Sequence, residues 1–273
     1  MWRAKMVAAI AVVAVLSTGG CGDQAVKKST ARSSAERTTI GRSPVTDLTA
    51  ASQGDAIEAL RGKTVVVDAG HNRRNHLHRE EISKQVDAGN GTKKACNTTG
   101  TQTDDGYTEA EFNWDVSQRF VKLLEAAGAT VVTTVKDDTP WGPCVNERAR
   151  IANESGAAAV ISIHGDGGPD SGSGFHVMEP GAPGPVQAES HRLATAVRDA
   201  CRSGTGMPTS SYIGADGLNP RSDMAGLNLS TKPIVMLESG NMRNGADAAR
   251  MKDPAFRQTI AQSLVTALRN YLA

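Results

Sequence analysis

The sequence predicts an α/β fold, in which one domain holds a mostly parallel, twisted sheet covered by helices on both faces. Two observations support this fold class. Continuous apolar runs of strand length alternate with amphipathic stretches of helix length, a pattern typical of parallel strands that are buried on both faces. The chain has 273 residues, of which 39% are apolar and 4% aromatic, so it can build one core of ordinary size and still carry extra segments.

The predicted elements begin near residue 55, where the segment 55–63 indicates a short helix or turn. From there, apolar runs without polar interruption predict strands, and apolar residues at spacings of three and four predict helices. In chain order these are strand 63–70, helix 111–128, strand 129–135, helix 146–156, strand 157–165, helix 186–204, strand 232–240 and helix 254–273. Open sheets of this type place their sites beyond the carboxyl ends of the strands.

The N-terminus predicts an export signal. Arg3 and Lys5 precede the apolar stretch 6–16, and small residues then lead to Cys21, which is the order of a secretory signal. The apolar stretch is well short of the roughly 20 residues that a membrane-spanning helix needs. Cys21 follows two glycines, as the acylated cysteine of a bacterial lipoprotein does, so residues 1–21 are predicted to be a signal peptide with a lipobox. A simple signal without a lipid is the alternative.

Residues 22–54 are predicted to be a flexible tether, because most of this segment is rich in Ser, Thr, Ala and Arg and lacks hydrophobic periodicity. The folded domain is expected to occupy residues 55–273. Either form of signal predicts export, to the outer face of the membrane as a lipoprotein or to the periplasm, cell wall or medium. The net charge is +1 and the basic clusters lie in loops, so no nucleic-acid partner is expected.

Export changes how the cysteines are interpreted. Cys96 and Cys144 lie in loops rich in Gly, Pro and Asn, and an oxidising compartment would allow them to pair. Cys201 lies at the end of an amphipathic helix and is expected to be a small buried residue. The spacing of the four cysteines is not that of a zinc ribbon, so metal ligation by sulfur is not expected.

Three predicted strands end in residues that can bind a metal or transfer a proton. His71 directly follows the strand 63–70, His164 ends the run VISIH, and Glu238 ends the run IVMLE. Because the carboxyl ends of parallel strands share one rim of the sheet, these three side chains could converge. Taken alone, each histidine would more simply be a structural residue.

The helix start GYTEAEFNWDV supplies another carboxylate. Thr108 and Glu111 have the spacing of a capping box, which assigns Glu111 a structural role. Glu109 lies about 200° away from Glu111 around the helix and shares the inward stripe of Phe112 and Val116. A carboxylate at this position either interacts with the helix dipole or binds a ligand.

Together these residues predict a zinc site. Two imidazoles and one carboxylate are the protein ligands of hydrolytic zinc sites that keep one position open, and His71, Glu109 and His164 provide that set. Hydrolysis also needs a carboxylate that is not bound to the metal, to accept a proton from water and pass it to the leaving nitrogen. Glu238 is the residue predicted for this role.

Six separated motifs resemble those of the zinc-dependent N-acetylmuramoyl-L-alanine amidases, a family of bacterial and phage cell-wall enzymes. They are VVVDAGHN, TEAEFNWDVSQRFVKLLEAAGATVVTT, NERARIAN, AAAVISIHGDGG, SGFHV and PIVMLESGNMRNGAD. The resemblance extends in order over residues 63–273 and is closest to the small mycobacterial and actinobacterial members. It implies one Zn²⁺ bound by His71, Glu109 and His164, with Glu238 as the catalytic glutamate. It further implies cleavage of the amide between N-acetylmuramic acid and the L-alanine of the stem peptide, in peptidoglycan or its muropeptide fragments.

The sequence departs from the family pattern after both histidines, where NRRN replaces a glycine-rich turn and HGD replaces HAN. These changes concern substrate contacts more than metal ligands. Two other functions stay open, namely a zinc peptidase that cuts within the stem peptide and a non-catalytic wall-binding lipoprotein. The protein is expected to be a monomer. A Cys96–Cys144 disulfide would pin the far end of the long segment 73–106 beside the sheet, and the free part of this segment is expected to act as a flap over the substrate groove.

Further residues are predicted to support the site or to contact the substrate. Each of them lies in one of the family motifs or at the end of a strand. They are Asp68, Arg148, Asn153, His176 and Asn241. For Asp68, a bond to a histidine and a turn-forming role are both open.

Overall fold

The computed structural model describes residues 59–273. The predicted signal peptide with Cys21, the predicted tether and the start of the segment 55–63 lie outside the described residues. Within residues 59–273, no helix is long and apolar enough to cross a membrane.

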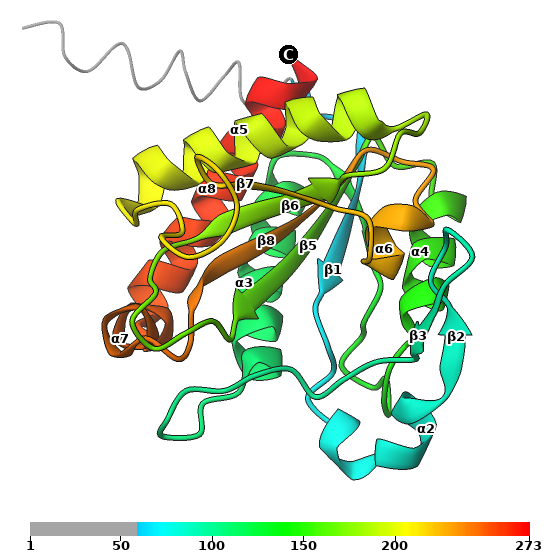
Figure 1. The fold of residues 1–273 in the computed structure, drawn as a ribbon. Helices are drawn as coiled ribbons and strands as arrows, with labels where there is room; N and C mark the ends of the chain where they lie inside the picture. Colours follow the sequence, from blue (N-terminus) through cyan, green and yellow to red (C-terminus); the bar gives the residue numbers. More distant parts are fainter. Residues whose placement is uncertain (1–58) are drawn as a thin grey trace, which may run out of the picture. The chain divides into compact units, whose positions relative to one another are not determined.

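A six-stranded sheet in the order β4-β1-β5-β8-β6-β7 forms the centre of the fold (Figure 1). Its strands are β1 (Thr64–Ala69), β4 (Thr130–Thr133), β5 (Ala159–Asp166), β6 (His176–Pro180), β7 (Leu218–Arg221) and β8 (Ile234–Asn241). Four of the five pairings are parallel, and β6 runs antiparallel to β8. The prediction of one α/β domain with a mostly parallel sheet is confirmed.

Helices cover both faces of this sheet, as predicted (Figure 1). One face packs against α3 (Glu109–Ala126), α5 (Gln187–Thr205) and α8 (Pro254–Leu272), and the other against α4 (Val145–Glu154) and α6 (Ala225–Asn228). The alternation of side chains along a strand explains the two layers, since Val65 and Val67 join the larger core whereas Val66 joins the smaller one. The helix α7 (Gly245–Lys252) connects β8 to α8.

The larger core positions the helix that carries Glu109. Phe112, Val116, Phe120 and Leu124 of α3 are fully buried in that core. They recur at spacings of four, so they form one stripe that faces the sheet. Burial of this stripe fixes the rotation of α3 about its axis, and with it the direction of the first turn.

The sequence did not predict several short elements, because they are too short or too polar to show a period. In the segment 73–106 these are η1 (Asn75–Leu77), α2 (Arg79–Ser83) and the hairpin of β2 (Gln85–Asp87) and β3 (Lys93–Ala95). The strand β7, with sequence LNPR, and the short helices α6 and α7 were also not predicted. The role of this segment as a flap stays a prediction.

The disulfide that was predicted as possible is present. Cys96 and Cys144 are bonded and lie 48 residues apart in the chain, while Cys201 is buried and free, as expected. The bond joins the end of the hairpin segment to the start of α4, and the Val145 N–H donates to the Cys96 carbonyl over 2.7 Å. The residues that follow Cys96 are therefore tied to the body of the domain.

Candidate metal centre

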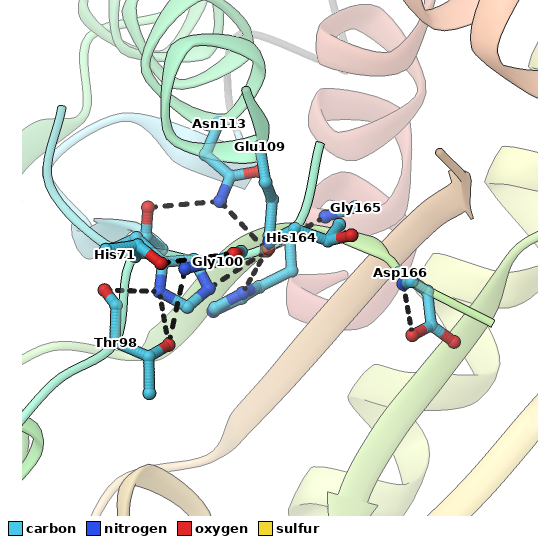
Figure 2. A network of polar contacts seen from close by, with 12 residues as sticks. His71, Thr98, Gly100, Glu109, Asn113, His164, Gly165 and Asp166 are labelled. Carbon is cyan, nitrogen blue, oxygen red and sulfur yellow. Dashed lines mark hydrogen bonds and ion pairs between the residues drawn. The ribbon is translucent and has the colours of Figure 1, made fainter. Parts of the chain in front are cut away.

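Three side chains from distant parts of the chain meet at the rim where β1 and β5 end (Figure 2). One ligand atom from each of His71, Glu109 and His164 lies within 4.8 Å of the other two. Glu109 Oε1 is 3.1 Å from His71 Nε2 and 2.9 Å from His164 Nδ1. Two imidazole nitrogens and a carboxylate in this arrangement could hold one metal ion.

The start of α3 explains why Glu109 rather than Glu111 joins the two histidines. Thr108 is the N-cap residue, and its hydroxyl accepts from the Glu111 N–H while the Glu111 carboxylate accepts from the Thr108 N–H. This capping box holds Glu111 at the exposed end of the helix. Glu109 points inward instead, and only 4% of it is exposed.

Hydrogen bonds from three sides orient the Glu109 carboxylate. Its Oε2 accepts from the Thr101 N–H over 2.9 Å, and its Oε1 accepts from the Gly165 N–H and from Asn113 Nδ2, each over 3.3 Å. Burial alone would raise the pKa of Glu109, but the charges and hydrogen bonds of the two histidines hold it well below its usual value. Glu109 is therefore an oriented anion, the form in which a carboxylate binds metal.

His71 has an unusual backbone conformation. Its φ is +62°, a left-handed conformation that costs free energy in a non-glycine residue. Its side chain is oriented by Thr98, whose carbonyl oxygen and hydroxyl each lie 3.1 Å from Nδ1. With Nδ1 engaged in this way, Nε2 faces Glu109, as expected for a metal ligand whose other nitrogen is held by a neighbouring group.

Arg148 holds the turn that carries His71. Its guanidinium donates to the carbonyl oxygens of Ala69, His71 and Gly142 and to Asp68 Oδ1, the last over 2.7 Å. All of these groups belong to the ends of β1 or to the loop before α4. Arg148 is thus placed to stabilise the strained conformation of His71.

Asp68 is the charge partner of Arg148 and contacts no histidine through a hydrogen bond within residues 59–273. Its carboxylate also accepts from the hydroxyls of Ser162, over 2.5 Å, and Thr134. Burial would raise the pKa of Asp68, but the positive charge of Arg148 and the two hydroxyls lower it from 3.8 to about 2. Of the two roles considered for Asp68, neither a bond to a histidine nor a turn is observed.

We expect Asp68→Asn to destabilise the fold by about 3 kcal/mol at neutral pH, because it leaves the Arg148 charge buried without its partner. Because the folded pKa is lowered, the ionised form of Asp68 stabilises the fold above about pH 4, and this contribution of about 2 kcal/mol is lost as the pH falls toward 2. Denaturant unfolding from pH 7 to pH 3 should show a smaller loss of stability below pH 4 in the variant. Asp138→Asn is the control, because Asp138 is exposed and forms no ion pair within residues 59–273, and equal slopes in wild type and Asp68→Asn would contradict the assignment.

Glu238 lies next to the cluster without joining it. In the sheet, Glu238 is the register neighbour of His164 on β5 and of His176 on β6, so the three side chains point to the same face. Glu238 is 7% exposed, and its Oε2 has no hydrogen-bond partner in the described part of the chain. Burial, followed by the negative charges of Glu109 and Asp166, raises its pKa well above the usual value. Compared with an exposed glutamate, Glu238 is therefore shifted toward its protonated form.

Comparisons with known proteins agree with this geometry. Residues 65–270 match the model of the N-acetylmuramoyl-L-alanine amidase family. The chain belongs to this family. A relative, the N-acetylmuramoyl-L-alanine amidase Rv3717 of Mycobacterium tuberculosis, is 41% identical over 216 residues, which cover 78% of this chain and 88% of the relative. This family membership confirms the resemblance that the sequence motifs indicated.

Solved structures of two amidases show the same fold. The N-acetylmuramyl-L-alanine amidase Ami1 of Mycobacterium smegmatis is 43% identical, with a TM-score of 0.74, and the alignment covers 78% of this chain and 98% of that one. Ami1 of Mycobacterium abscessus is 42% identical with the same TM-score, over 78% of this chain and all of that one. The described domain is therefore an amidase-family domain over nearly its whole length.

In this family member, His176 and Asn241 were also predicted to support the site or to contact the substrate, and their surroundings differ from each other. His176 is fully buried, and neither ring nitrogen has a hydrogen-bond partner among residues 59–273. Burial lowers its pKa to about 4, so the ring is neutral. Asn241 Nδ2 donates to the carbonyl oxygens of Pro169 and Gly172, each over 2.8 Å, and so holds the loop between β5 and β6.

Asn153 does not lie at the rim. Its side chain bonds Leu229 and Thr231, which precede β8, so it is at the opposite end of the sheet from the metal ligands. It supports the start of the strand that carries Glu238, not the site itself.

Several residues that shape the site of this amidase-family domain were missed from the sequence. Thr98, Thr101 and Asn113 orient the ligands, and Tyr212 donates its hydroxyl to Asp166 Oδ2 over 2.8 Å. The spacing of Asn113, four residues after Glu109 on the same helical face, was a usable signal. The other contacts depend on the path of loops, which periodicity does not reveal.

A cavity of about 270 Å³ lies beside His71 and His164 on the face covered by α4 and α6. Its apolar lining includes Val145, Met224 and Met236. His164 projects to this face, as does its register neighbour Glu238. The ligands are therefore reachable from a partly apolar groove.

We expect Gly70→Ala to abolish metal binding by the amidase-family domain, because there is no room for a side chain. A Cβ at Gly70 would lie 2.3 to 2.6 Å from three atoms of the His164 ring, so the ring would have to leave its position. Metal content of the purified variant tests this. Gly245→Ala is the control, since nothing lies within 4 Å of its Cβ position, and a fully metal-loaded Gly70→Ala protein would show the expectation to be wrong.

Proposed function

We propose that this protein is a zinc-dependent N-acetylmuramoyl-L-alanine amidase. It would hydrolyse peptidoglycan or muropeptide fragments at the amide between N-acetylmuramic acid and the L-alanine of the stem peptide. The observation that carries this proposal is the cluster of His71, Glu109 and His164 beside the buried Glu238, in a chain of the amidase family. The amidase names of the relatives in three mycobacteria support the substrate class.

The donor set fits zinc. Two imidazoles and one carboxylate leave a tetrahedral ion one open position, which is the pattern of catalytic zinc sites. Zn²⁺ bound there would polarise the scissile carbonyl and lower the pKa of water to near neutrality. Thr98 would hold the His71 ring, and the Thr101 and Gly165 amides would hold the Glu109 carboxylate, in the orientation that coordination needs.

Glu238 would move the proton. As a carboxylate it would accept a proton from the attacking water, and the water oxygen would form the new bond to the carbonyl carbon. As that carbon releases the alanine nitrogen, Glu238 would return the proton to it, which yields a free amine and a lactyl carboxylic acid. The raised pKa of Glu238 makes its carboxylate a stronger proton acceptor than an exposed carboxylate, which favours the first half of this exchange.

We also propose that the protein is exported and that residues 55–273 form its catalytic domain. The Cys96–Cys144 disulfide supports this location, because such bonds persist in oxidising compartments. Lipid attachment at Cys21, with membrane anchoring of a monomer, is part of the same proposal.

The test combines metal analysis with product analysis. Purified protein is expected to contain one zinc per chain, and mass spectrometry of digested muropeptides should show intact stem peptides with a free L-alanine amine. Fragments cut inside the stem peptide would identify a zinc peptidase instead. Zinc-loaded protein that leaves muropeptides intact would favour a binding protein and contradict the proposal.

A further inference from the structure

Two cavities lie against the loop that follows His71. The first, of about 150 Å³, is lined by Gly70, His71 and the residues up to Arg74, together with Trp114 and the segment after β4. The second, of about 340 Å³, is lined by Arg73, Arg79 and the residues 99–102. The two share Asn72, Arg73 and Ala110. They therefore adjoin each other and the candidate metal centre.

The charged residues that line these cavities are mainly basic. The first contains Arg73, Arg74 and Lys136, and the second contains Arg73 again with Arg79. Among the described residues that line them, Asp137 is the one carboxylate. We call the surface formed by Arg73, Arg74, Arg79 and Lys136 the basic groove.

Arg73 is held in position but keeps its capacity to bind an anion. Its guanidinium carbon lies 4.4 Å from the centre of the Trp114 ring, and this stacking orients the plane of the group. Its ion pair with Asp137 involves a carboxylate that is 79% exposed, and such exposed pairs contribute little. A guanidinium has five N–H donors, so most of them stay available.

Arg74 and Arg79 carry charges that the protein does not neutralise. Both are exposed, and neither forms an ion pair within residues 59–273. Arg74 lies with Arg73 in NRRN, which replaces the glycine-rich turn of the family, whereas Arg79 lies four residues beyond this stretch. The charge of Arg74 therefore lies three residues after a candidate metal ligand, and the charge of Arg79 lies on the adjoining cavity.

We propose that the basic groove binds a carboxylate of the stem peptide and so fixes which half of the substrate lies on this side of the metal centre. The inference rests on the proposed function. At the scissile amide, the sugar half is neutral because its lactyl carboxyl is already in the amide bond. The peptide half carries the free carboxylates. Of the two halves, only the peptide half is complementary to a basic surface.

The distances along the chain are compatible with this assignment. An extended peptide advances about 3.5 Å per residue, so a carboxylate two or three residues beyond the amide is about 7 to 10 Å from the reacting carbon. Arg73 and Arg74 line the same cavity as His71, so their long side chains lie in the region that such a carboxylate would reach. The groove thus selects for acidic residues near the cleaved bond.

The experiment compares two muropeptides that differ only in whether the carboxylates beyond L-alanine are free or amidated. We expect wild-type protein to cleave the free form with a kcat/KM about tenfold higher, and this ratio should fall toward one as salt is raised. In Arg73→Met/Arg79→Met the ratio should fall to about one at low salt. Arg150→Met, which removes an exposed arginine from α4, should keep the wild-type ratio.

A second measurement separates binding from hydrolysis. The dissociation constant of each muropeptide is measured by calorimetry with Glu238→Gln, alone and combined with Arg74→Gln, which should weaken binding of the free form only. Equal cleavage of both muropeptides by wild type, or an unchanged ratio in the double variant, would overturn the basic groove but leave the amidase. Cleavage of neither muropeptide by zinc-loaded wild type would overturn the proposed function itself.

Discussion

Replacing Glu238 with glutamine should lower the rate of amide hydrolysis by more than about a hundredfold, while the protein keeps its metal. The amide of glutamine has nearly the same shape as the carboxylate but cannot accept and return a proton. Because Glu238 is not among the three clustered ligands, coordination should not change. Turnover of a muropeptide and metal content, measured on the same preparation, test both halves of this expectation.

Glu179→Gln is the matched control for this variant. Glu179 is also a buried glutamate of the sheet, but it lies on β6 and pairs with His191. The Glu179→Gln protein should therefore keep both its hydrolytic activity and its bound metal. If Glu238→Gln keeps wild-type turnover, or if it loses its metal, the role assigned to Glu238 is wrong.

Removing the Glu109 carboxylate should abolish metal binding and hydrolysis together. Glu109 Oε1 contacts both histidines, and Glu109→Ala also leaves the Thr101 and Gly165 amides without their acceptor. We expect affinity for zinc to fall by more than about a hundredfold, since loss of a group that merely orients a ligand already costs 10- to 100-fold. Competition with a chelating dye measures this affinity.

The neighbouring Glu111→Gln makes this prediction specific. Both glutamates lie in the first turn of α3, but Glu111 serves the capping box, so its replacement should leave zinc affinity unchanged. A protein that loses zinc with Glu111→Gln and keeps it with Glu109→Ala would reverse the assignment of the two residues. Far-ultraviolet circular dichroism of both variants shows whether α3 is intact.

The parts of the fold that were predictable are those with a local signal. The strand 63–70 and the helix 111–128 showed a clear apolar pattern, and the capping box distinguished Glu109 from Glu111. The convergence of strand ends followed from the parallel sheet. These arguments need only residues that are close in sequence or equivalent in topology.

The parts that were not predictable depend on long-range contacts. Thr98 reaches His71 across 27 residues, and Arg148 reaches Asp68 across 80. No periodic pattern marks such a pair, because Thr98 and His71 lie in loops, and Asp68 and Arg148 lie on a strand and a helix whose patterns do not reveal the contact. The reversed direction of β6 was hidden for the same reason, since pairing direction depends on where a connection returns.

The antiparallel direction of β6 determines which loops surround the candidate metal centre. Because β6 runs antiparallel to β8 and parallel to β7, the segments 167–175 and 206–217 both return to the rim where β1, β5 and β8 finish. Tyr212, in the second of these segments, meets Asp166 there. One side of this rim is therefore built by loops that contribute none of the three clustered ligands. Insertions or substitutions in those loops can therefore alter the substrate preference without displacing His71, Glu109 or His164.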